Sequence, residues 1–500
     1  MVRRAPRNPP NRPLRARGAR TFCAVSHDTV DTYRTARVVG LASTAALGGF
    51  LFGYDSAVIN GATSAIKSRF GLGDFELGLV VSIALIGSAI GAWFAGALAE
   101  KYGRRKVMLI GASLFFISGI GSAFPFSAID LGMWRFIGGA GIGVASVVAP
   151  MYIAETAPAQ LRGRMGSLQQ FAIVIGIFAT GLVNYAILSA AGGDARNGWL
   201  FGLEAWQCMF LSMTIPAAIY FIFAARLPES PRYLISVGRL DDAKRILSSI
   251  YLDDVSARVI AIQDSMAGDH KPRFSDLKGN RFGLLPIVWV GIILSALQQF
   301  VGINAVFYYS NTIWEAVGFS ASQAFLTSLF TTAINVIFTI VAILLVDRVG
   351  RKPLLLVGSS GMVITLATLT YVFGTAPVNA AGQPVLSDGP DIVAMIAFNL
   401  YVAFFAATWG PIVWVLLGEM FPNRIRAAAL AVAAAAQWIA NFIVSTTFPT
   451  LAGMSLGIAY AIFTAFAVLS IPFVLKKVKE TKGVELEDMG ELEHARVAAA

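Results

Sequence analysis

The sequence predicts an all-α protein that crosses a membrane twelve times. Three observations predict this fold class: the chain is 56% hydrophobic and only 14% charged, its mean hydropathy is +0.68, and it contains twelve apolar stretches of membrane-spanning length. The stretches cover residues 38–60, 77–99, 107–125, 131–153, 167–190, 205–225, 283–309, 322–346, 353–375, 392–417, 427–450 and 454–475. Gly and Pro interrupt several of them, which membrane helices tolerate.

Positive charge indicates the orientation of these spans. If the N-terminus is cytoplasmic, 35 of the 39 Lys and Arg residues fall in cytoplasmic segments, as the positive-inside rule requires. We therefore expect a multi-pass protein of the plasma (inner) membrane with both termini in the cytoplasm. Because the net charge of +10 is explained as an orientation signal, it gives no reason to expect nucleic-acid binding.

The expected domain organisation follows from the spacing of the spans. A basic, disordered N-terminal extension (1–35) precedes a six-span bundle (36–226), a cytoplasmic linker (227–282), a second six-span bundle (283–475) and a cytoplasmic tail (476–500). In the linker, the stretch "LDDAKRILSSIY" places Ala243, Ile246, Leu247 and Ile250 on one helical face. A small cytoplasmic helical subdomain is therefore expected there.

The two halves of the chain contain similar sequence motifs in corresponding positions. The stretch "EKYGRRK" (100–106) after the second span recurs as "DRVGRKP" (347–353) after the eighth. Gln170 in the fifth span has its counterpart in Gln437 in the eleventh. Such internal repeats are typical of transporters and predict two pseudo-symmetric six-helix bundles.

The motifs of the chain resemble those of the sugar porters of the major facilitator superfamily. "GYDSAVING", "PESPRYL", "QQFVGINAVFYYS", "WGPIVWVLLGEMFPNRIR" and "AAQWIANF" occur in the order of that family, and the resemblance covers about residues 36–483. It is nearest to the bacterial proton-coupled pentose and hexose symporters. The resemblance implies the major facilitator fold, with two bundles that rock around a central sugar site.

Polar residues within the spans are consistent with such a ligand. Gln298, Gln299, Asn304 and Tyr308 in span seven spread too widely for one face of a straight helix, so a break at Gly302 is expected. In span ten, "GP" at 410–411 can unwind the helix. Amides offer donors and acceptors to sugar hydroxyls, and aromatic rings can cover apolar sugar faces. The scarcity of carboxylates favours a neutral, polyhydroxylated ligand over a cation.

By resemblance, the sugar contacts fall on spans one, five, seven, eight, ten and eleven. They are Phe52, Gln170, Gln298, Gln299, Asn304, Tyr308, Asn335, Gly410, Trp414, Gln437 and Trp438, with Asn441 adjacent. The alternative for any one of these residues is a structural role, in which amides join helices and aromatics fill space.

Charged residues at the cytoplasmic helix ends form a second candidate site. In the family, such groups make an Arg–carboxylate network that closes the inner face. By resemblance its members are Arg104, Arg105, Glu155, Arg164, Glu229, Arg232, Asp347, Arg351, Glu419 and Arg426. The alternative is that they only orient the helices in the membrane.

Two charges lie within spans and well away from the ends, Asp55 in span one and Arg135 in span four. They reach similar depths from opposite sides, and a charge in a span is costly unless it is paired. We expect the two to pair, with Asp55 as the proton site and Arg135 as its partner. The alternative is a static bridge between the two helices.

The resulting hypothesis is proton-coupled symport of a neutral monosaccharide such as glucose or xylose. A facilitative sugar uniporter, a drug–proton antiporter and a non-transporting sugar sensor are the alternatives. Relative to the family, the chain has Gln207 in place of a common Arg and Met213 where some proton symporters carry an acid. No span contains a histidine or a nucleophile–base pair, so we expect no enzyme, no metal and no other cofactor. The expected partners are a monosaccharide, protons and the lipid bilayer, with the protein as a monomer.

Overall fold

The first half of the chain is built from long helices with short connections. The computed structural model describes residues 33–267, 274–279, 283–377, 385–386, 389–422 and 425–482. Within these residues the chain is almost entirely helical. The first half contains α1 (Thr35–Val58), η1 (Ile59–Gly61), α2 (Thr63–Phe70), α3 (Asp74–Tyr102), α4 (Arg104–Ala123), α5 (Ala128–Thr156), α6 (Ala159–Ala190), α7 (Ala205–Ser212) and α8 (Thr214–Arg226).

The second half repeats this pattern after a group of short helices. The short helices are α9 (Pro231–Ser236), α10 (Leu240–Ile250), α11 (Ser256–Ala267) and η2 (Phe274–Leu277), and α10 is the helix expected at "LDDAKRILSSIY". The second half contains α12 (Pro286–Phe300), α13 (Ile303–Ala316), α14 (Ala321–Val349), α15 (Arg351–Thr375), α16 (Pro390–Ala407), α17 (Trp409–Met420), α18 (Arg426–Met454) and α19 (Leu456–Lys477).

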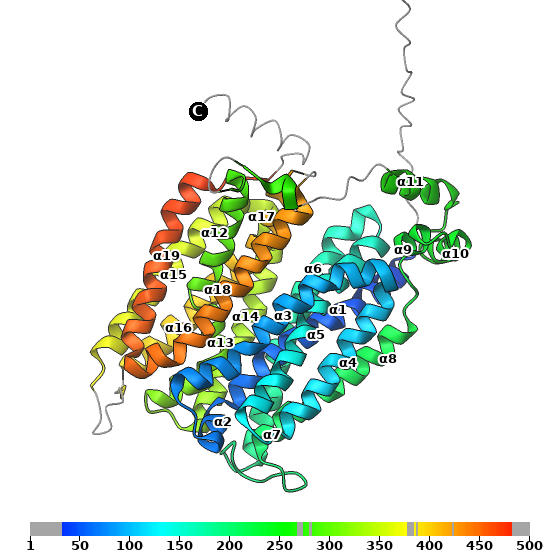
Figure 1. Cartoon of the computed structure of the whole chain (residues 1–500). Helices are drawn as coiled ribbons and strands as arrows, with labels where there is room; N and C mark the ends of the chain where they lie inside the picture. The colour runs from blue at the N-terminus through cyan, green and yellow to red at the C-terminus, as the bar shows by residue number, and fades with distance from the viewer. Residues whose placement is uncertain are drawn as a thin grey trace, which may run out of the picture.

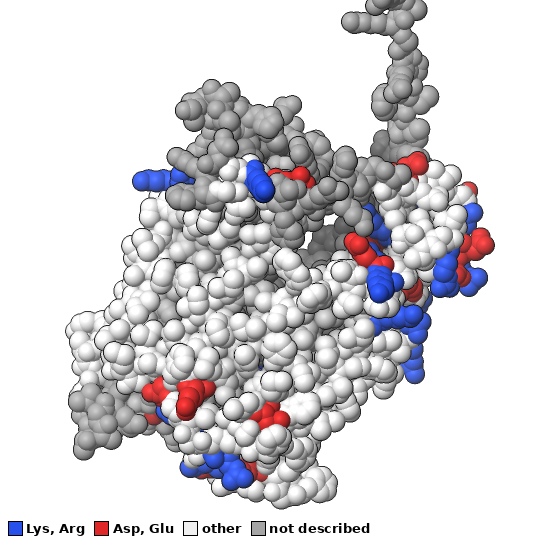
Figure 2. All heavy atoms as spheres, viewed as in Figure 1, with Lys and Arg blue, Asp and Glu red and all other residues white. Residues whose placement is uncertain are grey.

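The surface has the polarity of a membrane protein. Twelve helices or consecutive helix pairs among the described residues are long and apolar enough to cross a bilayer, as predicted. Figure 2 shows charged side chains at the two ends of the molecule and an uncharged band between them. Within the spans, large apolar side chains such as Trp93 on α3 and Ile364 on α15 are 60% and 68% exposed. The chain is therefore a multi-pass membrane protein.

Three spans are interrupted. Span seven breaks between α12 and α13 at Gly302, as predicted, and the φ of +90° there is one that glycine adopts without strain. Span ten breaks at Thr408, two residues before the predicted position Gly410. Span six breaks at Met213, which sequence reasoning did not predict.

Glycines bring the backbones of neighbouring helices into contact within the first bundle. A Cβ atom on Gly53 of α1 would lie 1.9 Å from the carbonyl oxygen of Ile173 on α6. A Cβ atom on Gly139 of α5 would lie 1.9 Å from the carbonyl oxygen of Ala84 on α3. These approaches leave no room for a side chain and fix the positions of α1 and α5, which carry Asp55 and Arg135.

The two bundles meet at one end of the molecule and diverge at the other. In Figure 1, α1–α8 and α12–α19 approach each other at the end that carries α2, α7 and α13, and lie apart at the end that carries α9–α11. We call the first the seam end and the second the linker end. One continuous apolar core joins the second bundle to the seam end of the first bundle, where it includes Ile59 and Ile66. A separate core fills the rest of the first bundle, around Phe115 and Tyr152.

Candidate functional site

Asp55 and Arg135 form a buried ion pair, as expected. The Nη1 of Arg135 lies 3.0 Å from the Oδ1 of Asp55 and also donates to the backbone oxygen of Asp55 at 3.2 Å. The side chains are 0% and 2% exposed. The guanidinium group of Arg135 lies 5.9 Å from the ring centre of Phe210, within cation–π range. The pair joins α1 to α5 in the interior of the first bundle.

The surroundings of the pair explain how it is accommodated. A Cβ atom on Gly138, one turn after Arg135, would lie 3.2 Å from the Oδ1 of Asp55 and 2.5 Å from the Oγ of Ser118. Glycine at this position therefore makes space for the carboxylate. The Oδ2 of Asp55 and the Nε of Arg135 are buried, and neither atom makes a hydrogen bond to any residue that the structure describes. One carboxylate oxygen is thus available to take a proton.

The amides of span seven gather at its break, next to the break in span ten. The Nε2 of Gln298 donates to the backbone oxygens of Trp409 and Gly410 at 2.8 and 3.0 Å. The Nε2 of Gln299 donates to the Oε1 of Gln298 at 3.4 Å, and the Nδ2 of Asn304 donates to the Oε1 of Gln299. The bond between Asn304 and Gln299 spans the break at Gly302, because in a straight helix residues five apart point to different faces.

Two aromatic contacts connect this region to the first bundle. The ring of Phe52 on α1 lies 6.1 Å from that of Trp438 on α18. The hydroxyl of Tyr308 on α13 lies near the side chains of Asn441 on α18 and Ser56 on α1. Phe52 and Ser56 flank Asp55 on α1, so the ion pair lies next to the predicted sugar contacts.

The remaining predicted sugar contacts differ in their exposure. Trp414 is 41% exposed, and the Oε1 of the half-buried Gln437 has no hydrogen-bond partner. Gln170 on α6 is half-buried, whereas Asn335 on α14 is 5% exposed. Helices α6 and α14 pack against each other across the two bundles. The two residues thus lie on helices of the interface between the bundles, and no hydrogen bond among the described residues joins either side chain to the other predicted residues.

At the linker end of the first bundle, an arginine and two glutamates form a network. The Nη2 of Arg104 lies 2.8 Å from the Oε1 of Glu155, whose other oxygen accepts a hydrogen bond from the hydroxyl of Ser230. The carboxylate of Glu229 accepts hydrogen bonds from the backbone N–H groups of Arg104 and Arg105 at 2.8 and 3.2 Å. Glu229 thereby caps the first turn of α4, where a negative charge is favourable.

The second bundle contains a matching network. The Nη2 and Nε of Arg351 bind the two oxygens of Glu419 at 2.7 and 3.0 Å, and the hydroxyl of Thr481 donates to Glu419 at 2.6 Å. The carboxylate of Glu480 accepts from the backbone N–H groups of Arg351 and Lys352 at 2.9 and 3.0 Å. Neither ion pair joins the two bundles: Arg104–Glu155 lies within the first bundle and Arg351–Glu419 lies within the second.

Sequence reasoning missed three members of these networks, namely Glu480, Ser230 and Thr481. The available signal was the recurrence of "ES" at 229–230 as "ET" at 480–481, directly after the last span of each half. Partial burial would raise the pKa of the Glu480 carboxyl, but the hydrogen bonds from backbone N–H groups outweigh it and hold the pKa below its usual value.

The four remaining predicted gate residues are Arg164, Arg232, Arg426 and Asp347. Arg164 and Arg232 are exposed on α6 and α9, and the Nε of Arg426 donates to the backbone oxygen of Phe421 at 3.0 Å. Asp347 belongs to α14, but its side chain lies outside what the structure describes.

The two departures from the family pattern have structural roles. Gln207 donates from its Nε2 to the backbone oxygen of Ala123 and accepts from the N–H of Glu204, so that it caps α7. Met213 is fully buried in the break between α7 and α8. An acid in its place would need a partner in this apolar core.

Comparisons with known proteins identify the family. A family model described as "Sugar (and other) transporter" matches residues 41–492. The chain is 54% identical to a glucose transport protein of Synechocystis sp. over 90% of this chain and 97% of that protein. It is 40% identical to a D-xylose-proton symporter of Escherichia coli over 91% of this chain and 96% of that protein.

Solved structures give the same result. The xylose transporter of Escherichia coli in an inward-open conformation matches with a TM-score of 0.77 at 38% identity, over 91% of this chain and 99% of that one. The same transporter bound to 6-bromo-6-deoxy-D-glucose matches with a TM-score of 0.73 at 38% identity, over 92% and 100%. The chain belongs to the sugar transporter family of the major facilitator superfamily.

Proposed function

We propose that the protein is a proton-coupled symporter of a neutral monosaccharide, a hexose or pentose such as glucose or xylose. Relatives named as a glucose transport protein and a D-xylose-proton symporter support this activity. The protein would act as a monomer in the plasma membrane, with both termini and the linker end in the cytoplasm. The distribution of Lys and Arg supports this orientation.

The observation that carries proton coupling is the position of the Asp55–Arg135 pair beside the contacts between the bundles. When Asp55 is ionised, it holds Arg135 by a charge-assisted hydrogen bond. A proton from the outer side binds the carboxylate and weakens that bond, because the attraction between opposite charges is lost. Sugar then loads, the bundles close on the outer side, and opening to the cytoplasm releases sugar and proton.

The substrate would bind between the amides at the break of span seven and the aromatic side chains of α17 and α18. Gln298, Gln299 and Asn304 would bind sugar hydroxyls, and the unpartnered Oε1 of Gln437 would accept another. Trp414, exposed at 41%, would cover an apolar face of the sugar. No carboxylate among these residues would attract a cation, which supports a neutral ligand over a cationic drug.

The two networks at the linker end would close the cytoplasmic side in the outward-open state. The two six-helix bundles would comprise residues 36–226 and 283–475, and each bundle would move as one body when the cytoplasmic side closes. In this structure each ion pair lies within one bundle, so closure would require these charged groups to pair across the two bundles; bidentate pairing, as between Arg351 and Glu419, is geometrically specific enough for such a contact.

Reconstituted vesicles test the coupling directly. With a membrane potential of 100 mV, negative inside, one proton per sugar supplies about 2.3 kcal/mol, which permits about 50-fold accumulation. Asp55→Asn is expected to keep sugar exchange and to lose accumulation. Asp74→Asn is the matched control, because Asp74 forms an exposed pair with Lys67, and it should accumulate sugar normally. Sustained accumulation by the Asp55→Asn variant would show that this residue is not the proton site.

A facilitative uniporter is the second candidate, favoured by one observation. Met213 stands where some proton symporters of the family carry an acid, so coupling would depend on Asp55 alone among the buried carboxylates described in the first bundle. Sugar addition to vesicles separates the two candidates, since a symporter alkalinises the outer medium and a uniporter does not.

A further inference from the structure

Hydrogen bonds between neutral groups join the two bundles at the seam end. The Nδ2 of Asn60 on η1 donates to the Oγ of Ser310 on α13 at 2.9 Å, and its Oδ1 accepts from the N–H of Asn311 at 3.1 Å. The hydroxyls of Thr63 on α2 and Thr312 on α13 lie 2.9 Å apart. We call this row of contacts between η1–α2 and α13 the external seam.

The external seam ends in a charged contact. The hydroxyl of Ser64, in the first turn of α2, donates to the Oε2 of Glu315 in the last turn of α13 at 2.8 Å. Glu315 is half-buried, so its carboxylate is partly removed from water when the seam is closed. The N-terminus of α2 also favours a negative charge at this position. Among the hydrogen bonds described in the seam, this is the one with an ionisable acceptor.

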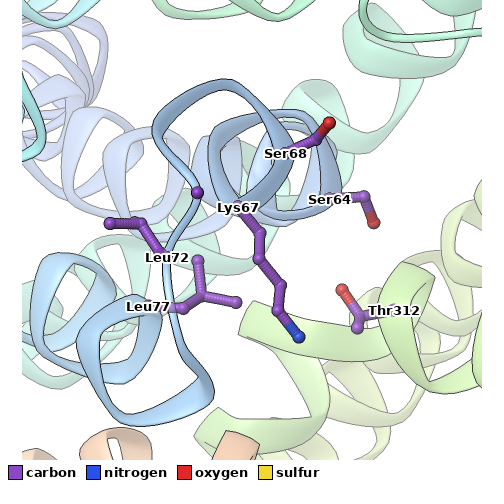
Figure 3. A pocket seen from close by; sticks show the side chains of 7 residues that line it. Ser64, Lys67, Ser68, Leu72, Leu77 and Thr312 are labelled. Carbon is purple, nitrogen blue, oxygen red and sulfur yellow. The ribbon is translucent and has the colours of Figure 1, made fainter.

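Neighbouring charges do not neutralise Glu315. Glu315 lines a cavity of about 280 Å³ together with Asp194 and Arg196, but Arg196 is already bound to Asp194 at 2.7 Å. On the other side, Lys67 lines an open hollow of about 410 Å³ with Ser64 and Thr312 (Figure 3). Its Nζ lies 2.5 Å from Asp74, so Lys67 is paired within its own bundle. The hydroxyl of Ser64 is therefore the donor that the first bundle offers to Glu315.

We propose that Ser64 and Glu315 are positioning residues of the transport cycle, which hold α13 against α2 while the outer side is closed. Opening to the outside must separate η1–α2 from α13 and so must break this contact. A hydrogen bond to a carboxylate is about twice as strong as one between neutral groups. Water replaces the donor when the seam opens, so the net contribution is small enough to be overcome in every cycle. The inference rests on alternating access but not on Asp55 as the proton site.

Distances between spin labels across the seam test the proposal. Labels at Arg69→Cys on α2 and Met454→Cys at the end of α18 would report on separation, because both positions are exposed. Cys23→Ser removes one native thiol, and the buried Cys208 is checked by labelling the parent protein. Full-length protein in lipid nanodiscs is measured by pulsed electron paramagnetic resonance, which needs no transport.

Ser64→Ala is expected to raise the ratio of externally open to closed molecules about fivefold, the effect of losing one net hydrogen bond. Glu315→Gln, which keeps a neutral acceptor, should give a smaller rise. Ser64→Thr restores the hydroxyl and should return the parental ratio. Ser68→Ala is the matched control, one turn further along α2.

Equal distance distributions for Ser64→Ala, Ser68→Ala and the parent would overturn the proposal, as would failure of Ser64→Thr to restore the parental ratio. The accumulation limit in vesicles should be unchanged in Ser64→Ala. The contact alters the ratio of externally open to closed molecules, but it does not alter the number of protons transported per sugar. Loss of accumulation in Asp55→Asn is measured separately, so the two proposals can fail independently.

Discussion

The close contact between α1 and α6 makes a sharp prediction for Gly53→Ala. The new Cβ would lie 1.9 Å from the carbonyl oxygen of Ile173 and 3.0 Å from the backbone nitrogen of Ile177. Ordinary contact begins at 3.4 Å, so the helices must separate by about 1.5 Å, and backbone atoms cannot rotate away. Such overpacking costs about 1–3 kcal/mol. A shift of that size in α1 also exceeds what the 3.0 Å bond between Asp55 and Arg135 can tolerate.

Gly40→Ala provides the matched control on the same helix. No atom lies within 4 Å of a Cβ at Gly40, so this change should leave function intact and slightly stabilise α1. Purified variants are compared by thermal melting and by sugar titration of tryptophan fluorescence. Gly53→Ala should melt several degrees lower and bind sugar more weakly, with proton-driven accumulation reduced further.

A second glycine extends the test. Gly176 on α6 faces α1, and its Cβ would lie 2.1 Å from the carbonyl oxygen of Phe50. Gly176→Ala should therefore reproduce the effect of Gly53→Ala. The loss of stability in the double variant should be smaller than the sum of the losses in the two single variants, because one separation of the helices relieves both contacts. If Gly53→Ala melts and binds sugar like Gly40→Ala, the close contact does not hold α1 in place and the reasoning fails.

Two further predictions concern the sugar site and the linker end. Gln437→Ala should weaken sugar binding about tenfold with little change in melting temperature, since the Oε1 of Gln437 makes no bond in the absence of sugar; an unchanged affinity in calorimetry would remove Gln437 from the site. Glu480→Gln should lower the melting temperature at pH 7. Because the pKa of Glu480 is lower in the folded protein, its stabilisation is complete above the unfolded value of about 4.5 and is lost as the pH falls through the folded value. The difference in melting temperature between the variant and the parent should therefore shrink as the pH falls below about 4.5, and a difference that stays constant with falling pH would contradict this account.

Much of the architecture could be predicted because the membrane restricts the length of the spans and the placement of charged residues within them. Apolar length sets the spans, and the high cost of charge left Arg135 as the one interior partner available to Asp55. The break at Gly302 was predictable because polar residues on both sides of it could not share one face. The break at Met213 was not, since an apolar residue in an apolar run carries no signal.

The external seam was missed for a related reason. Asn60, Thr63, Ser64 and Thr312 are small polar residues near helix ends, where such residues are ordinary in any membrane protein. Their role depends on which residues of the other bundle lie opposite them, and this is set by the tertiary structure. Glu480 was missed because its function depends on the N–H groups of a helix about 130 residues earlier in the chain.

Helix α1 would provide the physical connection between the proposed proton site and the proposed sugar site. The Asp55–Arg135 pair lies entirely within the first bundle, whereas most predicted sugar contacts lie in the second. On α1, Phe52 packs near Trp438 and Ser56 lies near Tyr308 of the second bundle, and Asp55 lies between Phe52 and Ser56 in sequence. If protonation of Asp55 releases Arg135, as proposed, any resulting shift of α1 would therefore move both of these residues relative to the second bundle. Coupling between proton and sugar then needs no long chain of residues, because a single helical turn carries both.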